Sequence, residues 1–169
     1  CTWNPALVQQ VGQAGAEEVK ENNLAVWLTP AVNIHRNPLC GRNFEYYSED
    51  GVLSGYMAAN EMNGAAVKGV YPYIKHFALN DQETNRTGML CTWSNEQAIR
   101  EIYLKPFEIS VKQGGANAVM VSWSFLGDKW TGGCSNLMNT VLRDEWGFRG
   151  MALTDFFRNN GHGFRNADA

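Results

Sequence analysis

Helical and strand-like patterns alternate along this chain of 169 residues, and no two strand-like runs are joined by a short turn. The strand-like runs are short and apolar, and they occupy residues 24–28, 73–77, 117–123 and 150–155. Antiparallel strands can be joined by a tight hairpin, whereas parallel strands need a crossover connection, which is usually a helix. The alternation therefore predicts an α/β fold in which helices cover a parallel sheet.

Four helices are expected in the intervals, and several of their ends carry capping signals. Asn4 should cap the first helix, and the second should span residues 53–63 and end at the glycine that follows. Ser94 begins a capping box for the third helix, which Pro106 should kink, and Ser135 should cap the fourth. The apolar residues expected to face the core from the last two helices are Ile99, Ile102, Tyr103, Phe107, Met138, Val141, Leu142 and Trp146.

Three of the predicted strands end on polar side chains, and this pattern narrows the fold further. The endings are Lys75-His76, Ser122-Trp123 and Thr154-Asp155. The carboxyl ends of parallel strands meet at one edge, which in a TIM barrel carries the active site. A complete barrel needs eight strands and about 250 residues. The chain therefore predicts an incomplete (β/α) TIM-like barrel, either a fragment or a piece that partners complete.

Asp155 is the leading candidate for a reactive group, because an apolar run over residues 150–154 ends directly on its carboxylate. We interpret this run as a buried strand, which places the acid at the mouth of a core. A carboxylate in that position can act as a nucleophile or as a general base. The alternative is a structural acid that caps a helix or joins a salt bridge.

Lys75 and His76 form the second candidate group, since they follow an aromatic and apolar segment. Neighbouring residues on a strand point to opposite faces, but at a strand end both can donate hydrogen bonds into one pocket. The alternative is a pair that supports the site from behind.

Two dense polar loops complete the candidates. In residues 40–50, Arg42 can hold a ligand hydroxyl or carboxylate, or it can pin its own loop through Glu45 or Asp50. Residues 80–86, taken alone, are typical of a solvated loop.

The composition excludes some classes of partner. The net charge is −3 and no basic run is present, so nucleic acid is not an expected partner. No apolar stretch approaches the length of about 18 residues that a membrane span needs, so no membrane is expected. The chain starts without Met or a signal-peptide pattern, so we expect a processed chain or a piece of a longer protein.

Cysteine and histidine spacing gives no metal or redox motif. His35 and Cys40 lack further ligands at convincing spacing, so we expect neither a metal nor a cofactor. No CxxC pair is present, and scattered thiols in a cytoplasmic protein are the simpler interpretation, with a disulfide framework as the alternative. The four cysteines are Cys1, Cys40, Cys91 and Cys134.

Several segments resemble glycoside hydrolase family 3, and they occur in the order of that family over nearly the whole chain. KHF is not followed by the Gly-His-Gly segment of the N-acetylglucosaminidase branch, so the glucosidase and xylosidase branch fits better. The matching segments are GRNFEYYSED at 41–50, KHF at 75–77 with Asn80 and Arg86, REIYL at 100–104, LRDEWGFRG at 142–150 and TDF at 154–156.

The resemblance implies roles for particular residues of this chain. Asp155 matches the nucleophile of a retaining mechanism, in which the sugar becomes covalently attached to the enzyme. Arg42, Lys75 and His76 match residues that hold the hydroxyls of the sugar, and Arg86 matches the arginine that follows the KHF segment. A further position of the binding site is Trp123, which stands where the family usually has Tyr.

The resemblance also implies that residues 1–169 are part of an N-terminal catalytic barrel domain of the β-glucosidase type. The expected substrate is an oligosaccharide or aryl β-glycoside with a terminal β-linked glucose. A β-xylosidase or exo-glucanase of the same family is one alternative. A non-catalytic fragment is another, because in this branch a separate C-terminal domain supplies the acid/base Glu. Open sheet edges further predict homo-oligomers or marginal folding.

Overall fold

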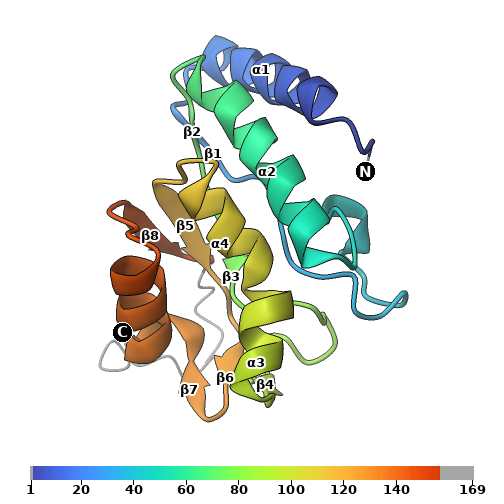
Figure 1. Cartoon of the computed structure of the whole chain (residues 1–169), viewed down its shortest axis with the longest axis vertical. Helices are drawn as coiled ribbons and strands as arrows, with labels where there is room; N and C mark the ends of the chain where they lie inside the picture. Colours follow the sequence, from blue (N-terminus) through green and yellow to red (C-terminus); the bar gives the residue numbers. More distant parts are fainter. Residues whose placement is uncertain (1, 157–169) are drawn as a thin grey trace.

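The structure, a computed structural model, describes residues 2–156, so Cys1 and the chain beyond Phe156 lie outside it. Helix α1 (Pro5–Glu21) begins at its predicted cap, since the Asn4 side chain accepts a hydrogen bond of 3.1 Å from the Leu7 amide. Figure 1 shows α1 beside helix α2 (Gly51–Ala66) at one end of the molecule.

Helix α2 continues past Gly64, where the sequence predicted its end. A Cβ at Gly64 would lie 2.1 Å from the Gln9 carbonyl oxygen, and a Cβ at Gly12 would lie 2.1 Å from the Glu61 carbonyl oxygen. These glycines therefore let the backbones of α1 and α2 touch. Gly64 serves close packing rather than helix termination.

A parallel sheet has the order β3-β5-β8, with β3 at Ile74–Phe77, β5 at Ala118–Val121 and β8 at Met151–Thr154. A second parallel pair joins β1 (Val26–Trp27) to β2 (Tyr71–Pro72) just before β3. The four predicted strand regions thus follow one another side by side in chain order. The predicted parallel α/β arrangement is confirmed.

Strand β8 differs from its prediction as a buried strand. Met151 is 56% exposed and Leu153 is 39% exposed. Among residues 2–156, β8 pairs only with β5 and forms the edge of the sheet. Its apolar side chains therefore lack the covering layer that buries β3 and β5.

The expectation that no hairpin occurs is wrong. Strand β6 (Phe125–Leu126) pairs antiparallel with β7 (Lys129–Trp130) through a two-residue loop, in which Gly127 has φ +62°. Gly followed by Asp is a known hairpin signal, and it lies at 127–128. Strand β4 (Cys91–Thr92) adds to β6 in parallel.

The third predicted helix is built from three pieces. A short turn α3 (Glu96–Ala98) leads into the π-helical segment η2 (Ile99–Tyr103), and α4 (Lys105–Lys112) follows. Pro106 lies in the first turn of α4, so it begins a new helix instead of kinking a continuous one.

Two details of this region were predicted wrongly. Asn95, not Ser94, caps α3, because its side chain accepts a 2.8 Å hydrogen bond from the Ala98 amide. Ile102 is 43% exposed, because the wider π-helical turn changes the angular spacing of side chains. Ile99 and Phe107 are buried as expected.

The fourth predicted helix is the π-helical segment η4 (Asn136–Glu145), preceded by a 3₁₀ turn η3 (Thr131–Gly133). Ser135 makes no capping hydrogen bond through its side chain, so that prediction is wrong. Gly147 has φ +76°, consistent with its predicted role at the helix end. The inward residues Val141, Leu142 and Trp146 are buried.

Aromatic packing fixes the end of β3. The ring of Phe77 lies edge-on to Phe107 and Trp146, with centroid distances of 5.2 Å and 6.0 Å. Each such pair contributes about 0.5–1.5 kcal/mol beyond burial. This cluster anchors the strand that carries Lys75 and His76.

Within residues 2–156, no helix has both the length and the apolar character that a membrane span requires. The described cysteines Cys40, Cys91 and Cys134 are free thiols.

Candidate active site

The predicted site residues come from the carboxyl ends of three neighbouring strands and from two loops. Lys75 and His76 lie on β3, Trp123 follows β5, and Asp155 follows β8 directly. The Asp155 amide donates a 3.2 Å hydrogen bond to the Val121 carbonyl, which continues the β5–β8 ladder to the acid. In Figure 1 strands β3, β5 and β8 lie between α1 and the β6–β7 hairpin.

His76 is buried and clamped through its backbone. The Asn33 side chain accepts from the His76 amide at 2.8 Å and donates to the His76 carbonyl at 3.0 Å. Arg42 Nη2 lies 3.0 Å from His76 Nε2. Since Arg can only donate, Nε2 is the acceptor and the proton of the neutral ring is on Nδ1.

The charge state of His76 follows from its surroundings. Burial lowers the pKa of His76 well below its usual value, and the charges of Arg42, Lys75 and Arg86 lower the pKa further. The neutral ring keeps Nδ1 buried without a hydrogen-bond partner among the described residues. This N–H is a donor that a bound hydroxyl could satisfy.

Glu45 joins two of the predicted residues, although the sequence suggested it only as a loop pin. Its carboxylate pairs with Arg42 Nε through Oε1 and lies 3.3 Å from Lys75 Nζ through Oε2. Burial alone would raise the pKa of Glu45, but the Arg42 hydrogen bond and the Lys75 charge outweigh burial and lower the pKa. Glu45 is therefore an anion that holds two cations in place.

Arg86 lies beside Asp155. Its Nη1 is 3.4 Å from Asp155 Oδ2, and its guanidinium carbon is 4.8 Å from the centre of the Trp123 ring. Its Nε is 3.0 Å from Glu83 Oε2. Asp155 Oδ1 in turn accepts a 2.7 Å hydrogen bond from the Phe156 amide, so both oxygens of the acid are held.

A buried chain of hydrogen bonds connects the two loops. Asn80 Nδ2 donates to Tyr46 Oη and to Glu83 Oε1, both at 3.0 Å, and Tyr46 donates to the Asn80 carbonyl at 3.2 Å. Burial raises the pKa of Tyr46, which keeps its hydroxyl a donor. Asn80 and Asp81 are buried, so the solvated-loop interpretation of 80–86 is wrong for its first residues.

Asp81 stabilises the segment that carries Asn33. Its carboxyl accepts a 2.6 Å hydrogen bond from the Ile34 amide, next to Asn33. Burial raises the pKa of Asp81 to about 6, against the hydrogen bond from Ile34. Sequence reasoning missed Glu83 and Asp81 and gave Glu45 only a loop role, because acidic residues in polar loops are equally typical of solvated positions.

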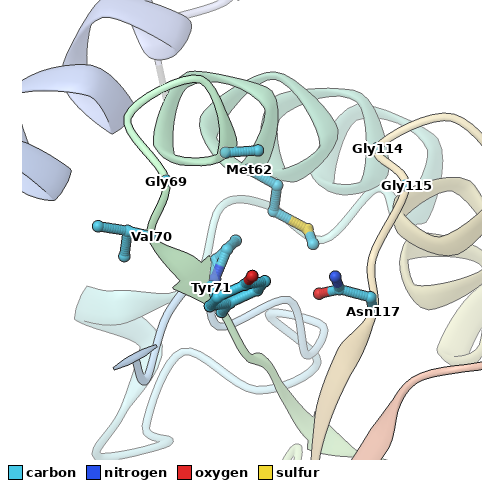
Figure 2. Close-up of a pocket in the computed structure, with 9 residues that line it drawn as sticks. Met62, Gly69, Val70, Tyr71, Gly114, Gly115 and Asn117 are labelled. Atoms are coloured by element: carbon cyan, nitrogen blue, oxygen red, sulfur yellow. The ribbon is translucent and has the colours of Figure 1, made fainter. Parts of the chain in front are cut away.

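A small cavity of about 140 Å³ lies at the opposite ends of the strands. Figure 2 shows Met62 of α2 above Tyr71 and Asn117, which precede β3 and β5. None of the predicted site residues lines this cavity. No group of three or more His, Cys, Asp or Glu within residues 2–156 is arranged to hold a metal ion.

The sequence profile described as the N-terminal domain of glycosyl hydrolase family 3 matches residues 1–166. The chain belongs to this family. Its similarity to β-glucosidase A of Butyrivibrio fibrisolvens is 48% identity over 93% of this chain and 19% of that protein. With the β-glucosidase of Ruminococcus albus it shares 44% identity over 94% of this chain and 17% of the relative.

Specificity varies among the family members at similar identity. An exo-α-(1→6)-L-arabinopyranosidase of Bifidobacterium longum is 44% identical over 92% of this chain and 20% of that protein. The chain thus spans about one fifth of the length of these relatives.

The solved structures agree with the fold. β-Glucosidase 3B of Thermotoga neapolitana in complex with glucose matches with a TM-score of 0.90 and 51% identity, covering 92% of this chain and 22% of that chain. The parallel sheet and its helices are part of a TIM-like barrel, as predicted.

Proposed function

We propose that this chain is the nucleophile-bearing part of a retaining β-glucosidase and that residues 1–169 belong to a partial N-terminal barrel domain. The observation that carries this proposal is the carboxylate of Asp155, held beside Arg86 at the end of a parallel strand. The relatives named β-glucosidase and the glucose complex of a similar structure support glucose as the sugar.

The chemistry takes two displacements. A carboxylate oxygen of Asp155 attacks the anomeric carbon, and the bond to the leaving oxygen breaks with its electron pair while that oxygen takes a proton from an acid group. A water molecule then gives a proton back to the same group and displaces the Asp155 carboxylate from the same carbon, which restores the original configuration.

The cation-rich half of the site suits sugar hydroxyls. The Nδ1–H of His76, the ammonium of Lys75 and the guanidinium of Arg42 are donors near one another. Hydrogen bonds that tighten as the ring becomes oxocarbenium-like stabilise the transition state more than the substrate.

The two acidic residues described close to Arg42 and Arg86 do not suit the role of the acid/base group. A retaining enzyme needs a second carboxyl group about 5–5.5 Å from the nucleophile, able to donate a proton. Glu45 and Glu83 are each paired with cations, and the pKa of Glu45 is lowered, so neither suits a proton donor. We propose that a further domain of a longer polypeptide supplies this group.

Two other functions differ in testable ways. A β-xylosidase or exo-glucanase would use the same Asp155 on a different sugar or a longer glucan. A non-catalytic piece would bind sugar at most weakly. The absence of a suitable acid among the described site residues favours this function over a chain that hydrolyses glycosides without a residue from another domain.

External azide separates these functions. A β-glucoside with a good leaving group needs no acid, and azide replaces the activated water. The chain should convert an activated aryl β-glucoside and azide into β-glucosyl azide and the phenolate, and Asp155→Ala should not. A folded chain that gives no azide product would sink the proposal, and faster turnover of the aryl β-xyloside would favour the xylosidase.

The exposed edge strand also bears on assembly. Met151 and Leu153 are exposed on β8, whose outer side has no strand neighbour within residues 2–156. Such edges pair with other strands. We propose that the isolated chain self-associates, so sedimentation should show oligomers, and a purely monomeric sample would contradict this.

A further inference from the structure

The side chain of Arg86 contacts Glu83, Asp155 and Trp123 at different distances. Its Nε is 3.0 Å from Glu83 Oε2, its Nη1 is 3.4 Å from Asp155 Oδ2, and its plane lies over Trp123. The contact with Glu83 is the shorter ion pair, whereas the contact with Asp155 is a hydrogen bond at the long limit of distance. Glu83 is therefore the closer of the two carboxylates to Arg86.

Glu83 is itself fixed to the buried frame of the site. Its other oxygen accepts the 3.0 Å hydrogen bond from Asn80, whose side chain is fully buried and also bonded to Tyr46. The Glu83 carboxylate thus has one oxygen on the frame and one on Arg86. Glu83 therefore links the turn that follows β3 to the guanidinium of Arg86, and so restricts the movement of that guanidinium beside Asp155.

The charges explain why such an anchor matters. Arg86 is one cation between two carboxylates, Glu83 and Asp155. A guanidinium without Glu83 can turn two N–H groups toward Asp155 and form a close bidentate pair. That pair would occupy oxygens that must attack the sugar.

We propose that Glu83 is a positioning residue that keeps Arg86 in single contact with Asp155, and this rests on the proposed function. Through Arg86, Glu83 leaves the nucleophile oriented but available. The carboxylate of Glu83 is paired with Asn80 and Arg86 and not with Asp155. We therefore expect Glu83 to affect the rate at which the sugar becomes attached to Asp155, and not the affinity for the sugar.

The test follows covalent labelling by a 2-deoxy-2-fluoro-β-glucoside with a good leaving group, measured by intact mass over time. Glu83→Gln should slow labelling at saturating reagent by about 10–100-fold, as expected for a misplaced reacting group, with little change in the half-saturating concentration. Glu96→Gln is the matched control, because Glu96 Oε1 meets Arg100 Nε at 2.8 Å on an exposed surface. The control should label at the wild-type rate.

A double-mutant cycle shows whether Glu83 acts through Arg86. In an Arg86→Met background, Glu83→Gln should cost nothing further. An equal loss in both backgrounds, or unchanged labelling of Glu83→Gln, would overturn the proposal. Glu83→Asp, which keeps the charge but withdraws the carboxylate, should give an intermediate loss and serves if Glu83→Gln does not fold.

A second readout does not depend on labelling. The NMR signal of the Arg86 Nε–H should shift in Glu83→Gln, because the carboxylate 3.0 Å from Nε loses its charge. An unchanged signal overturns the positioning role. Wild-type protein that stays unlabelled would instead refute the proposed function, and the Arg86 signal would still decide the role of Glu83.

Discussion

Strands β3 and β8 are both four residues long and both pair in parallel with β5, yet their surroundings differ sharply. Ile74 and Phe77 of β3 are fully buried, whereas Met151 and Leu153 of β8 are 56% and 39% exposed. Each strand nevertheless delivers a predicted site residue at its carboxyl end.

The difference shows that the two halves of the site are supported in different ways. His76 is held by the packed interior of the sheet and by the Asn33 clamp. Asp155 lies on an edge, where one backbone hydrogen bond to Val121 and the side chain of Arg86 orient it. The proposed sugar-binding half is thus preformed by the core, and the proposed nucleophile depends more on its side-chain neighbours.

The largest expected effect compares equivalent truncations on the two strands. Ile74→Ala should lower the free energy of unfolding by about 2–5 kcal/mol, because it opens a cavity in the core. Leu153→Ala should cost less than about 1 kcal/mol, because the side chain is already partly in water. Urea denaturation of both variants measures the contrast, and equal losses would refute the difference in packing.

The Asn33 clamp should be the next largest contribution. Asn33→Ala leaves the buried amide and carbonyl of His76 without partners, which should cost about 2–3 kcal/mol of unfolding free energy. Asn60→Ala, which removes an exposed bond to the Tyr56 carbonyl, is the control and should cost under about 1 kcal/mol. Similar losses of unfolding free energy from the two variants would show that the Asn33 clamp contributes no more to stability than an exposed side-chain hydrogen bond.

The smallest expected effect is a pair of opposite pH dependences. The pKa of His76 is lowered by folding, so below about pH 6.5 the unfolded chain binds a proton that the folded chain does not. Its contribution to stability therefore falls as the pH falls. The pKa of Asp81 is raised to about 6 from 3.8, so between these values the folded chain holds the extra proton and stability rises as the pH falls.

Variants should separate the two contributions between pH 6 and pH 5. When the pH falls from 6 to 5, the unfolding free energy of His76→Gln should rise by about 1 kcal/mol relative to that of wild type. Over the same interval, the unfolding free energy of Asp81→Asn should fall by about 1 kcal/mol relative to that of wild type. Denaturant titrations at both pH values measure these differences. Identical pH slopes for wild type and both variants would contradict the burial argument.

The sequence was sufficient to predict which strands are parallel and which residues meet at their ends. Polar groups that follow apolar runs in a parallel sheet share an edge, and this geometry brings Lys75, His76, Trp123 and Asp155 into one region. The loop residues Arg42 and Arg86 were found through their motifs, and each lies against a strand-end residue.

Other features depend on neighbours that a linear pattern does not encode. The apolar run of β8 is the same whether a covering layer is present or not, so its exposure was missed. Gly64 looks like a helix end, but the approach of α1 makes it a packing position. Glu83 became recognisable only when the fold placed its two oxygens between Asn80 and Arg86.

The most direct measurement is the mass of the chain after incubation with a 2-deoxy-2-fluoro-β-glucoside that bears a good leaving group, followed by peptide mapping. Our account predicts one added fluoroglucosyl unit, attached to Asp155 and absent from Asp155→Ala. A folded chain that remains unlabelled, or that carries the sugar on another residue, would contradict Asp155 as the nucleophile.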